Sequence, residues 1–173
     1  MAGNKPQQDF VPLHIAIVTV SDTRTEENDT SGQFLVDSLE AEGHVLFQKY
    51  ICKDDVDALR ALVKELIEDD SVHAVLTTGG TGFTKRDNTV VALQPLLESQ
   101  IDGFGELFRH LSYAEIGSST IQSRAFAGLS NNTVVFCMPG STGACKTAWQ
   151  GIIREQLDSR HKPCNFVDRV TAR

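Results

Sequence analysis

The sequence has no run of about 18 apolar residues, so it predicts no membrane-spanning helix. Its first segment, MAGNKPQQDF, is polar and lacks the apolar stretch of a secretory signal. No two of the four cysteines form C-x-x-C, and none lies at zinc-ligand spacing with a histidine. We therefore expect reduced thiols in a cytoplasmic protein with no membrane partner.

Positive charge is scarce along the chain. Sixteen Lys and Arg face 23 Asp and Glu, and the formal net charge is −7. This balance argues against nucleic-acid binding, in which a basic face dominates affinity. A small anionic ligand is still allowed, but its site must then supply local positive charge, amide donors or a metal ion.

Several familiar catalytic signatures are missing as well. The five histidines show no pattern of a Ser-His-Asp or Cys-His arrangement. The glycine-rich stretch TTGGTGFTKRD, residues 77–87, has neither the Walker A spacing nor G-x-G-x-x-G. The residues therefore support neither a Ser-His-Asp or Cys-His nucleophile nor one of these two nucleotide-binding motifs.

Apolar patterning predicts an α/β domain with a largely parallel sheet. The expected strands cover 13–21, 44–53, 73–78 and 132–140. Helical spacing predicts helices over 32–42, 55–68, 88–98, 104–114, 118–128 and 142–157. Strands and helices that alternate along the chain favour parallel strands with right-handed crossovers. We expect a flexible tail over 1–9 and a single domain over 10–173, whose last residues, 158–173, trail over the surface or pack on a partner.

A polar segment lies at the end of each of the four expected strands. These segments are Ser21-Asp22, Asp54-Asp55, Thr78–Asp87 and Pro139–Thr142. Ligands of open α/β sheets bind beyond the carboxyl ends of the strands. The sequence therefore predicts that these segments converge on one rim.

The glycine-rich loop has two interpretations, and its residues alone favour them equally. Amides near glycine can approach an anion closely, and hydroxyl and basic side chains can assist. The residues in question are Thr78, Gly79, Gly80, Thr81, Gly82, Lys85 and Arg86. The alternative is a tight strand-to-helix turn whose basic residues are merely solvated.

Asp54 and Asp87 are each open to two interpretations. Either aspartate can stabilise the start of the helix that follows it. Either can instead face the rim and bind Mg²⁺ or orient a nucleophile. Two carboxylates at neighbouring strand ends would repel each other unless a cation lay between them. A pair there would predict a metal requirement.

Two further helix entries carry small polar residues. Pro139, Gly140 and Ser141 join the last strand to a helix, where hydroxyls and helix amides make an anion site. A plain helix cap at Ser141 or Thr142 is slightly favoured on local grounds. Ser31-Gly32 form a similar entry, with Asp29, Thr30 or Ser31 as the cap.

Three long segments, in order, resemble the MoaB/Mog family of molybdenum cofactor biosynthesis. They are LTTGGTG…RD, GFGELFRHLSYAEIGSSTIQSRA and MPGSTGACKTAWQGII. The resemblance runs from about Ile15 to Phe166. The third segment and the terminal KPCNF resemble the bacterial B-type branch in particular.

The resemblance implies a three-layer α/β/α domain that binds molybdopterin and adenylylates it with Mg²⁺-ATP. A non-catalytic molybdopterin carrier is the alternative. By position, Asp87 and Asp54 match the family's acidic residues, implied here to be catalytic and to bind Mg²⁺. The residues that match its ligand loops are Ser31, Gly32, Thr78, Gly79, Gly80, Thr81, Gly82, Arg86, Pro139, Gly140 and Ser141. The family also implies a homo-hexamer or trimer, with other enzymes of the pathway as partners.

Overall fold

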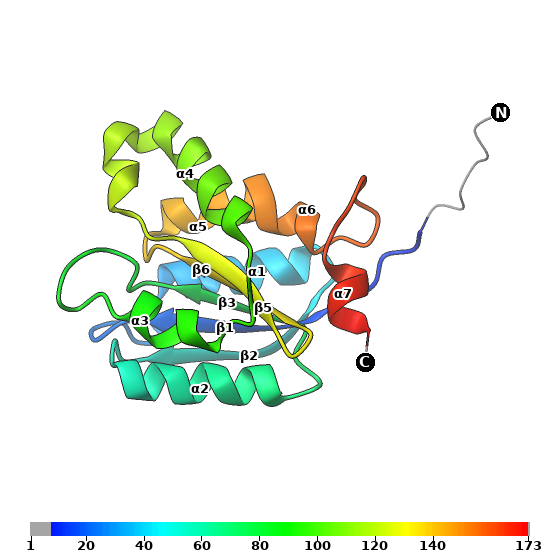
Figure 1. Ribbon diagram of the computed structural model, residues 1–173, viewed down its shortest axis with the longest axis horizontal. Helices are drawn as coiled ribbons and strands as arrows, with labels where there is room; N and C mark the ends of the chain where they lie inside the picture. The colour runs from blue at the N-terminus through cyan, green and yellow to red at the C-terminus, as the bar shows by residue number, and fades with distance from the viewer. Residues whose placement is uncertain (1–7, 173) are drawn as a thin grey trace.

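A six-stranded sheet forms the centre of the computed structural model, which describes residues 8–172 (Figure 1). The strands are β1 His14–Val20, β2 Val45–Cys52, β3 Ala74–Thr78, β4 Ser99–Gln100, β5 Phe126–Ser130 and β6 Thr133–Met138. Their order in the sheet is β2-β1-β3-β6-β5-β4. The pairs among β2, β1, β3 and β6 are parallel, whereas β5 pairs antiparallel with both β6 and β4. The largely parallel sheet is therefore confirmed, with an antiparallel edge.

Helices cover both faces of this sheet and make three layers, as Figure 1 shows. One face carries α1, α4, α5 and α6, and the other carries α2 and α3. The helices are α1 Thr30–Ala41, α2 Val56–Glu68, α3 Thr89–Leu93, η1 Gln94–Leu96, α4 Asp102–Ile116, η2 Gly117–Gln122, α5 Thr142–Ala148, η3 Trp149–Ile153, α6 Arg154–Gln156 and α7 Val167–Thr171. Within residues 8–172, no helix is long and apolar enough to cross a membrane.

Alternation along the central strands produces the two apolar cores. Ile15 and Ile17 of β1 point into the core under α1, α4 and α5. Ala16 and Val18, their neighbours, point into the core under α2. Successive strand side chains leave opposite faces, and both faces here are covered, so the strand reads as a continuous apolar run. This is why the central strands were predictable from composition.

The helix expected over 118–128 was wrong. Residues 117–122 form the short 3₁₀ helix η2, and Phe126–Ser130 is strand β5. Asn131 and Asn132 both have positive φ and make the two-residue turn between β5 and β6. Such a turn requires left-handed residues, and asparagine tolerates that conformation well. The pair of asparagines was the hairpin signal that helical spacing obscured.

The C-terminal segment, expected over 158–173 to trail over the surface or pack on a partner, lies largely on the surface but also contributes to the core. Val167 and Val170 of α7 are fully buried in the core under α1, α4 and α5. The Ser159 hydroxyl donates to the Asp9 carbonyl and accepts the Val11 amide, which ties residues near both ends together. Of the tail expected over 1–9, residues 1–7 lie outside the described residues.

Candidate functional site

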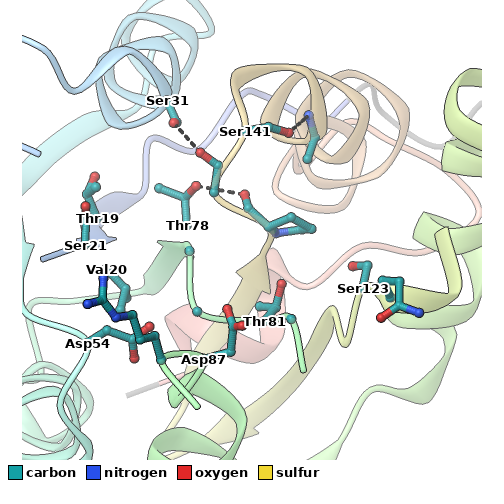
Figure 2. Close-up of a pocket in the computed structure, with 18 of the residues that line it drawn as sticks. Thr19, Val20, Ser21, Ser31, Asp54, Thr78, Thr81, Asp87, Ser123 and Ser141 are labelled. Carbon is teal, nitrogen blue, oxygen red and sulfur yellow. Dashed lines mark hydrogen bonds between the residues drawn. The ribbon is translucent and has the colours of Figure 1, made fainter. Parts of the chain in front are cut away.

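A cleft of about 520 Å³ lies at the carboxyl ends of the parallel strands. Its walls come from the segments after β1, β2, β3 and β6 and from α4 and η2. The predicted rim segments therefore do converge. Those of the predicted site residues that line the cleft are Ser31, Asp54, Thr78, Gly79, Gly80, Thr81, Gly82, Arg86, Asp87, Pro139, Gly140 and Ser141. Figure 2 shows several of them around the opening.

The glycine loop begins with two left-handed residues. Gly79 has φ +109° and Gly80 has φ +71°, a region that other residues avoid. Space is equally restrictive, because a Cβ at Gly79 would lie 2.3 Å from the Val20 carbonyl oxygen. The Gly79 amide donates to the Met138 carbonyl, which joins the loop to the end of β6. The glycines thus let the chain turn sharply between two neighbouring strands.

Hydroxyl groups join the glycine loop to the opposite wall. The Thr78 hydroxyl donates to the Pro139 carbonyl at 2.9 Å, and the Ser31 hydroxyl donates to the Gly140 carbonyl at 2.8 Å (Figure 2). Ser141 is the N-cap of α5, and its hydroxyl oxygen accepts the Ala144 amide. Thr78 and Ser31 therefore hold the walls together. They are less available as ligand donors than the sequence suggested.

Asp54 occupies the turn between β2 and α2 but does not cap α2. That cap is Asp55, whose carboxylate accepts the Ala58 amide. Asp54 instead reaches the start of α3, where its Oδ1 accepts the Asn88 amide at 3.0 Å. Burial raises the pKa of Asp54, and the negative charges of Asp87 and Asp22 raise it further, against the hydrogen bonds from Asn88.

Asp87 closes the glycine loop and likewise is not a helix cap. Asn88 is the N-cap of α3. The Asp87 Oδ2 accepts the Thr84 amide at 2.9 Å and the Thr84 hydroxyl at 2.6 Å. Burial opposes ionisation of Asp87, but hydrogen bonds from Thr84 and Gly82 and the charge of Arg124 outweigh it, so its pKa lies below the ordinary value. Asp87 is thus held as a carboxylate at the cleft.

The two carboxylates make one side of the cleft acidic. Figure 2 shows Asp54 and Asp87 on the side away from Ser31 and Ser141. Burial is the main reason that the pKa of Asp54 is raised, and repulsion from Asp87 adds to it; a bound cation would relieve that repulsion. Among residues 8–172 there is no cluster of three or more metal-ligating side chains. A Mg²⁺ ion fits such a pair, because it takes one or two carboxylates and completes its shell with water and phosphate oxygens.

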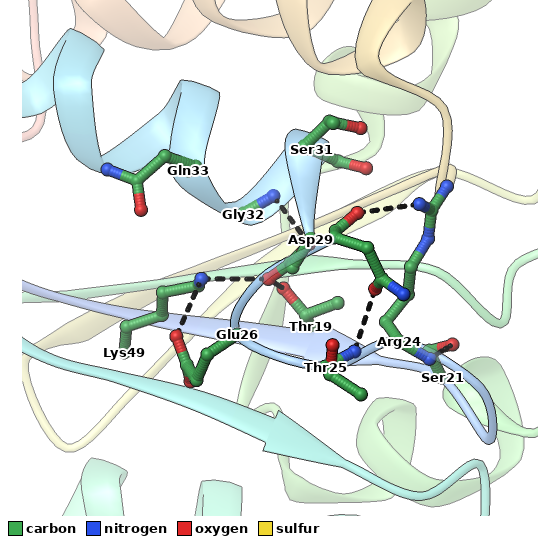
Figure 3. Close-up of polar contacts among 12 residues, drawn as sticks. Thr19, Ser21, Arg24, Thr25, Glu26, Asp29, Ser31, Gly32, Gln33 and Lys49 are labelled. Atoms are coloured by element: carbon green, nitrogen blue, oxygen red, sulfur yellow. Dashed lines mark hydrogen bonds and ion pairs between the residues drawn. The ribbon is translucent and has the colours of Figure 1, made fainter.

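A buried polar network supports the wall that carries Ser31 (Figure 3). The Asp29 carboxylate caps α1 by accepting the Gly32 amide, and it also accepts the Thr19 hydroxyl at 2.7 Å. The Lys49 ammonium lies 3.2 Å from Asp29 and 3.1 Å from Glu26. A Cβ at Gly32 would lie 2.2 Å from the Asp29 carboxylate, so glycine is required there by space.

Breaking this ion pair should destabilise the fold. The Asp29 side chain is fully buried and that of Lys49 is 9% exposed. Lys49→Met should lower the free energy of unfolding by about 2–3 kcal/mol, at the low end for a broken buried pair, because Asp29 keeps its other two donors. Lys64→Met is the control, since the Lys64–Glu68 pair is exposed and contributes under about 1 kcal/mol. Equal urea midpoints for the two variants would contradict this assignment.

The same pair gives the protein a predicted alkaline limit. Burial lowers the pKa of Lys49, but hydrogen bonds and charges from Glu26 and Asp29 outweigh it and raise the pKa above 10.5. A group whose pKa is higher in the folded than in the unfolded protein stabilises the fold fully below the unfolded-state pKa. That stabilisation is lost as pH rises through the folded-state pKa. In wild type, the stabilisation from Lys49 should therefore fade only above about pH 10.5, whereas Lys49→Met lacks it at every pH.

Sequence reasoning missed one whole wall of the cleft. Side chains of α4 and η2 complete it, namely Phe108, Ser112, Ile116, Ser119, Gln122 and Ser123. Arg24, from the loop after β1, also lines the cleft, and its guanidinium donates to the Asn28 carbonyl (Figure 3). The cluster of small polar residues in GSSTIQS was the available signal. Gly32 and Lys85 do not line the cleft.

Comparison with known proteins matches this chain to one family along most of its length. The family described as "Probable molybdopterin binding domain" matches residues 16–159. A protein of Escherichia coli (strain K12) named molybdenum cofactor biosynthesis protein B is 54% identical over 158 residues, which are 91% of this chain and 93% of that protein. The corresponding protein of Bacillus subtilis (strain 168) is 47% identical over 142 residues, 82% of this chain and 84% of that protein.

Solved structures agree with the sequence matches. A crystal structure of molybdenum cofactor biosynthesis protein B superposes with a TM-score of 0.83 at 47% identity, over 87% of this chain and 94% of that one. The tungsten cofactor synthesizing protein MoaB from Pyrococcus furiosus superposes with a TM-score of 0.70 at 34% identity, over 83% of this chain and 92% of that one.

Proposed function

Since the chain belongs to the MoaB/Mog family of molybdenum cofactor biosynthesis proteins, we propose that it binds molybdopterin in the cleft and adenylylates it with Mg²⁺-ATP. The observation that carries the proposal is the meeting of Asp54 and Asp87 beside the glycine loop. Two carboxylates from different strand ends share this space with a row of backbone amides. That combination suits a phosphate-bearing ligand and its cation.

The proposed reaction is a phosphoryl-type displacement at the α-phosphorus of ATP. An oxygen of the terminal phosphate of molybdopterin forms a new bond to that phosphorus. The α–β phosphoanhydride bond breaks, and pyrophosphate leaves with its electron pair. Such a reaction depends on alignment and charge stabilisation rather than on a covalent enzyme intermediate. This agrees with a cleft in which residues 8–172 place no Ser-His-Asp arrangement.

Asp54 and Asp87 are the residues that would hold Mg²⁺. When bound, the ion neutralises negative charge on the phosphates. Asp87 suits this role because its lowered pKa keeps it ionised, and the Thr84 donors fix its orientation. Asp54 suits it because burial, and to a lesser extent the charge of Asp87, disfavours its ionised form without a cation. The two carboxylates would thus also align the phosphates that share the ion.

Backbone and basic groups would bind the phosphate oxygens directly. Gly80 and Thr81 line the cleft and their amides would bind phosphate oxygens, whereas the Gly79 amide donates to Met138 and the Gly82 amide to Asp87. Arg86 lines the same cleft and is exposed, so it can form a bidentate contact with a phosphate. One well-placed donor that stabilises the charge developing in the transition state can raise a rate by about 10²–10³-fold.

Thermal unfolding with ligands tests the proposal. Molybdopterin, and Mg²⁺ with ATP, should each raise the melting temperature. A ligand at a hundred times its Kd stabilises by about 2.7 kcal/mol, or roughly 5–11 °C for a domain of this size. ATP without Mg²⁺ is the control and should stabilise less. A shift with molybdopterin but none with Mg²⁺-ATP would identify a carrier, and no shift with either would exclude both roles.

We also propose that the chain acts as a homo-hexamer or trimer. Large apolar side chains are exposed near the junction of α4 and η2, namely Tyr113, Ile116 and Ile121. Exposed apolar groups that lie near one another on a surface are typical of subunit contacts. Sedimentation velocity should give the mass of three or six chains, and a monomer at micromolar concentration would contradict this.

A further inference from the structure

Arg124 lies behind the glycine loop, on the side away from the cleft. It follows η2 and precedes β5, and it lines a separate cavity of about 490 Å³ with Val90, Gln94, Arg109 and Ile121. It is not among the residues that line the candidate site. The helix expected over 118–128 gave it no role. Its contacts, however, all go to the loop that forms the site.

The guanidinium of Arg124 donates to backbone carbonyls of the loop. Nε donates to the Thr81 carbonyl at 3.4 Å, and Nη2 donates to the carbonyls of Gly82 and Asp87, the latter at 3.3 Å. The Arg124 backbone amide also donates to the Thr81 carbonyl at 2.9 Å. The planar fork of arginine suits several acceptors at once, which an ammonium group does not. One side chain therefore binds both ends of the segment 81–87.

The tip of the same loop packs on the same guanidinium. The Phe83 ring centroid lies 4.7 Å from Cζ of Arg124, a cation–π distance. Phe83 is 64% exposed, so few other side chains hold the tip in place. Within the loop, the Thr84 amide donates to Asp87 Oδ2 and the Asp87 amide donates to the Thr84 carbonyl. The segment 81–87 is thus closed on itself, and Arg124 anchors it from outside.

We propose that Arg124 is a positioning residue, which fixes the segment Thr81–Asp87 so that its amides and the Asp87 carboxylate face the cleft. It acts through the loop carbonyls and Phe83, not by touching a ligand. Its importance for ligand binding rests on the proposed function, but its effect on the loop does not. The two parts can therefore fail separately.

Amide hydrogen exchange of the protein without ligand tests the effect on the loop. In Arg124→Met, the Thr84 and Asp87 amides should exchange about tenfold faster or more, because the charge-assisted hydrogen bonds that hold the loop are lost. Arg60→Met is the matched control, since Arg60 donates to the Ala92 and Val91 carbonyls away from the cleft. Arg60→Met should leave the exchange rates of the Thr84 and Asp87 amides unchanged. Equal exchange in wild type and Arg124→Met would overturn the proposal.

Arg124→Lys separates positioning from general stability. Lysine keeps the charge, but its donors sit on one nitrogen and cannot reproduce the planar fork whose Nε and Nη2 bind separate carbonyls. We therefore expect a rate of loop exchange between those of wild type and Arg124→Met, with exchange of the α2 amides unchanged. This variant also decides the matter if Arg124→Met does not fold. Acceleration spread evenly over α2 and the loop would contradict a positioning role.

Nucleotide affinity provides the second readout. The Kd for Mg²⁺-ATP, measured by titration calorimetry, should rise about tenfold to a hundredfold in Arg124→Met, because small displacements of aligned groups have large effects. Arg124→Lys should fall between, and Arg60→Met should match wild type. If wild type binds no nucleotide, the proposed function fails while the exchange result still decides the role of Arg124. Unchanged affinity in a variant with a loosened loop would overturn the link to binding.

Discussion

Asp87→Asn is expected to reduce adenylyl transfer by about 10³-fold or more while leaving the fold intact. Asparagine has the shape of aspartate, and its oxygen can still accept the Thr84 amide and hydroxyl that Asp87 Oδ2 accepts now. The negative charge is lost, and with it one of the two carboxylates proposed to hold Mg²⁺. Purified variant and wild type would be compared by single-turnover formation of adenylylated molybdopterin.

The control for this substitution removes the same charge at a site without a predicted role. Asp57 lies in the first turn of α2 and is exposed, and Asp57→Asn should keep wild-type turnover. Melting temperatures of both variants should stay within a few degrees of wild type. Near wild-type transfer by a folded Asp87→Asn would refute the catalytic assignment. Loss of Mg²⁺-ATP binding without loss of molybdopterin binding would locate the defect at the metal.

Gly79→Ala should cause the largest loss of stability in the candidate site. At φ +109° an L-residue is strained by about 1–3 kcal/mol. The new Cβ would also lie 2.3 Å from the Val20 carbonyl, which belongs to the central strand β1 and cannot move aside cheaply. We expect a total loss of about 4 kcal/mol or more, and a melting temperature lower by about 8 °C or more.

Gly143→Ala is the matched control for the glycine substitution. Gly143 lies within α5, and a Cβ there would meet no atom within 4 Å. Alanine in a helix is about 0.5–1 kcal/mol better than glycine, so this variant should melt slightly higher than wild type. A Gly79→Ala protein that melted within 2 °C of wild type would show that the loop relaxes freely.

Local patterns predicted the central fold well and its edge poorly. The run LHIAIVTVS is rich in apolar, β-branched residues, and Ile15–Val20 of β1 are buried on both faces accordingly. Residues 118–128 have a sparser apolar pattern, and they form η2 and the start of β5. Helix and strand periodicity are ambiguous over short segments, and the hairpin is decided by pairing with β6.

Capping residues show a similar division. Asp29, Thr30 and Ser31 were the three candidate caps of α1, and the structure selects Asp29. A helix cap at Asp87 was equally plausible locally, yet Asn88 occupies that position and Asp87 binds Thr84. Asp54, from another strand end, accepts the Asn88 amide, and the Asp87 side chain turns back to Thr84 within the loop. The cap position is therefore not settled by local sequence.

The sequence by itself determined the strand–helix alternation, the glycine loop and the family, because these depend on residue types at short spacing. Only the tertiary structure decided which distant residues meet. Asp54 and Asp87 share a cleft because β1 lies between β2 and β3 in the sheet, with all three strands parallel. Arg124 anchors the loop because the antiparallel edge brings η2 behind it. Strand order and pairing are global properties of packing, and short-range spacing does not encode them.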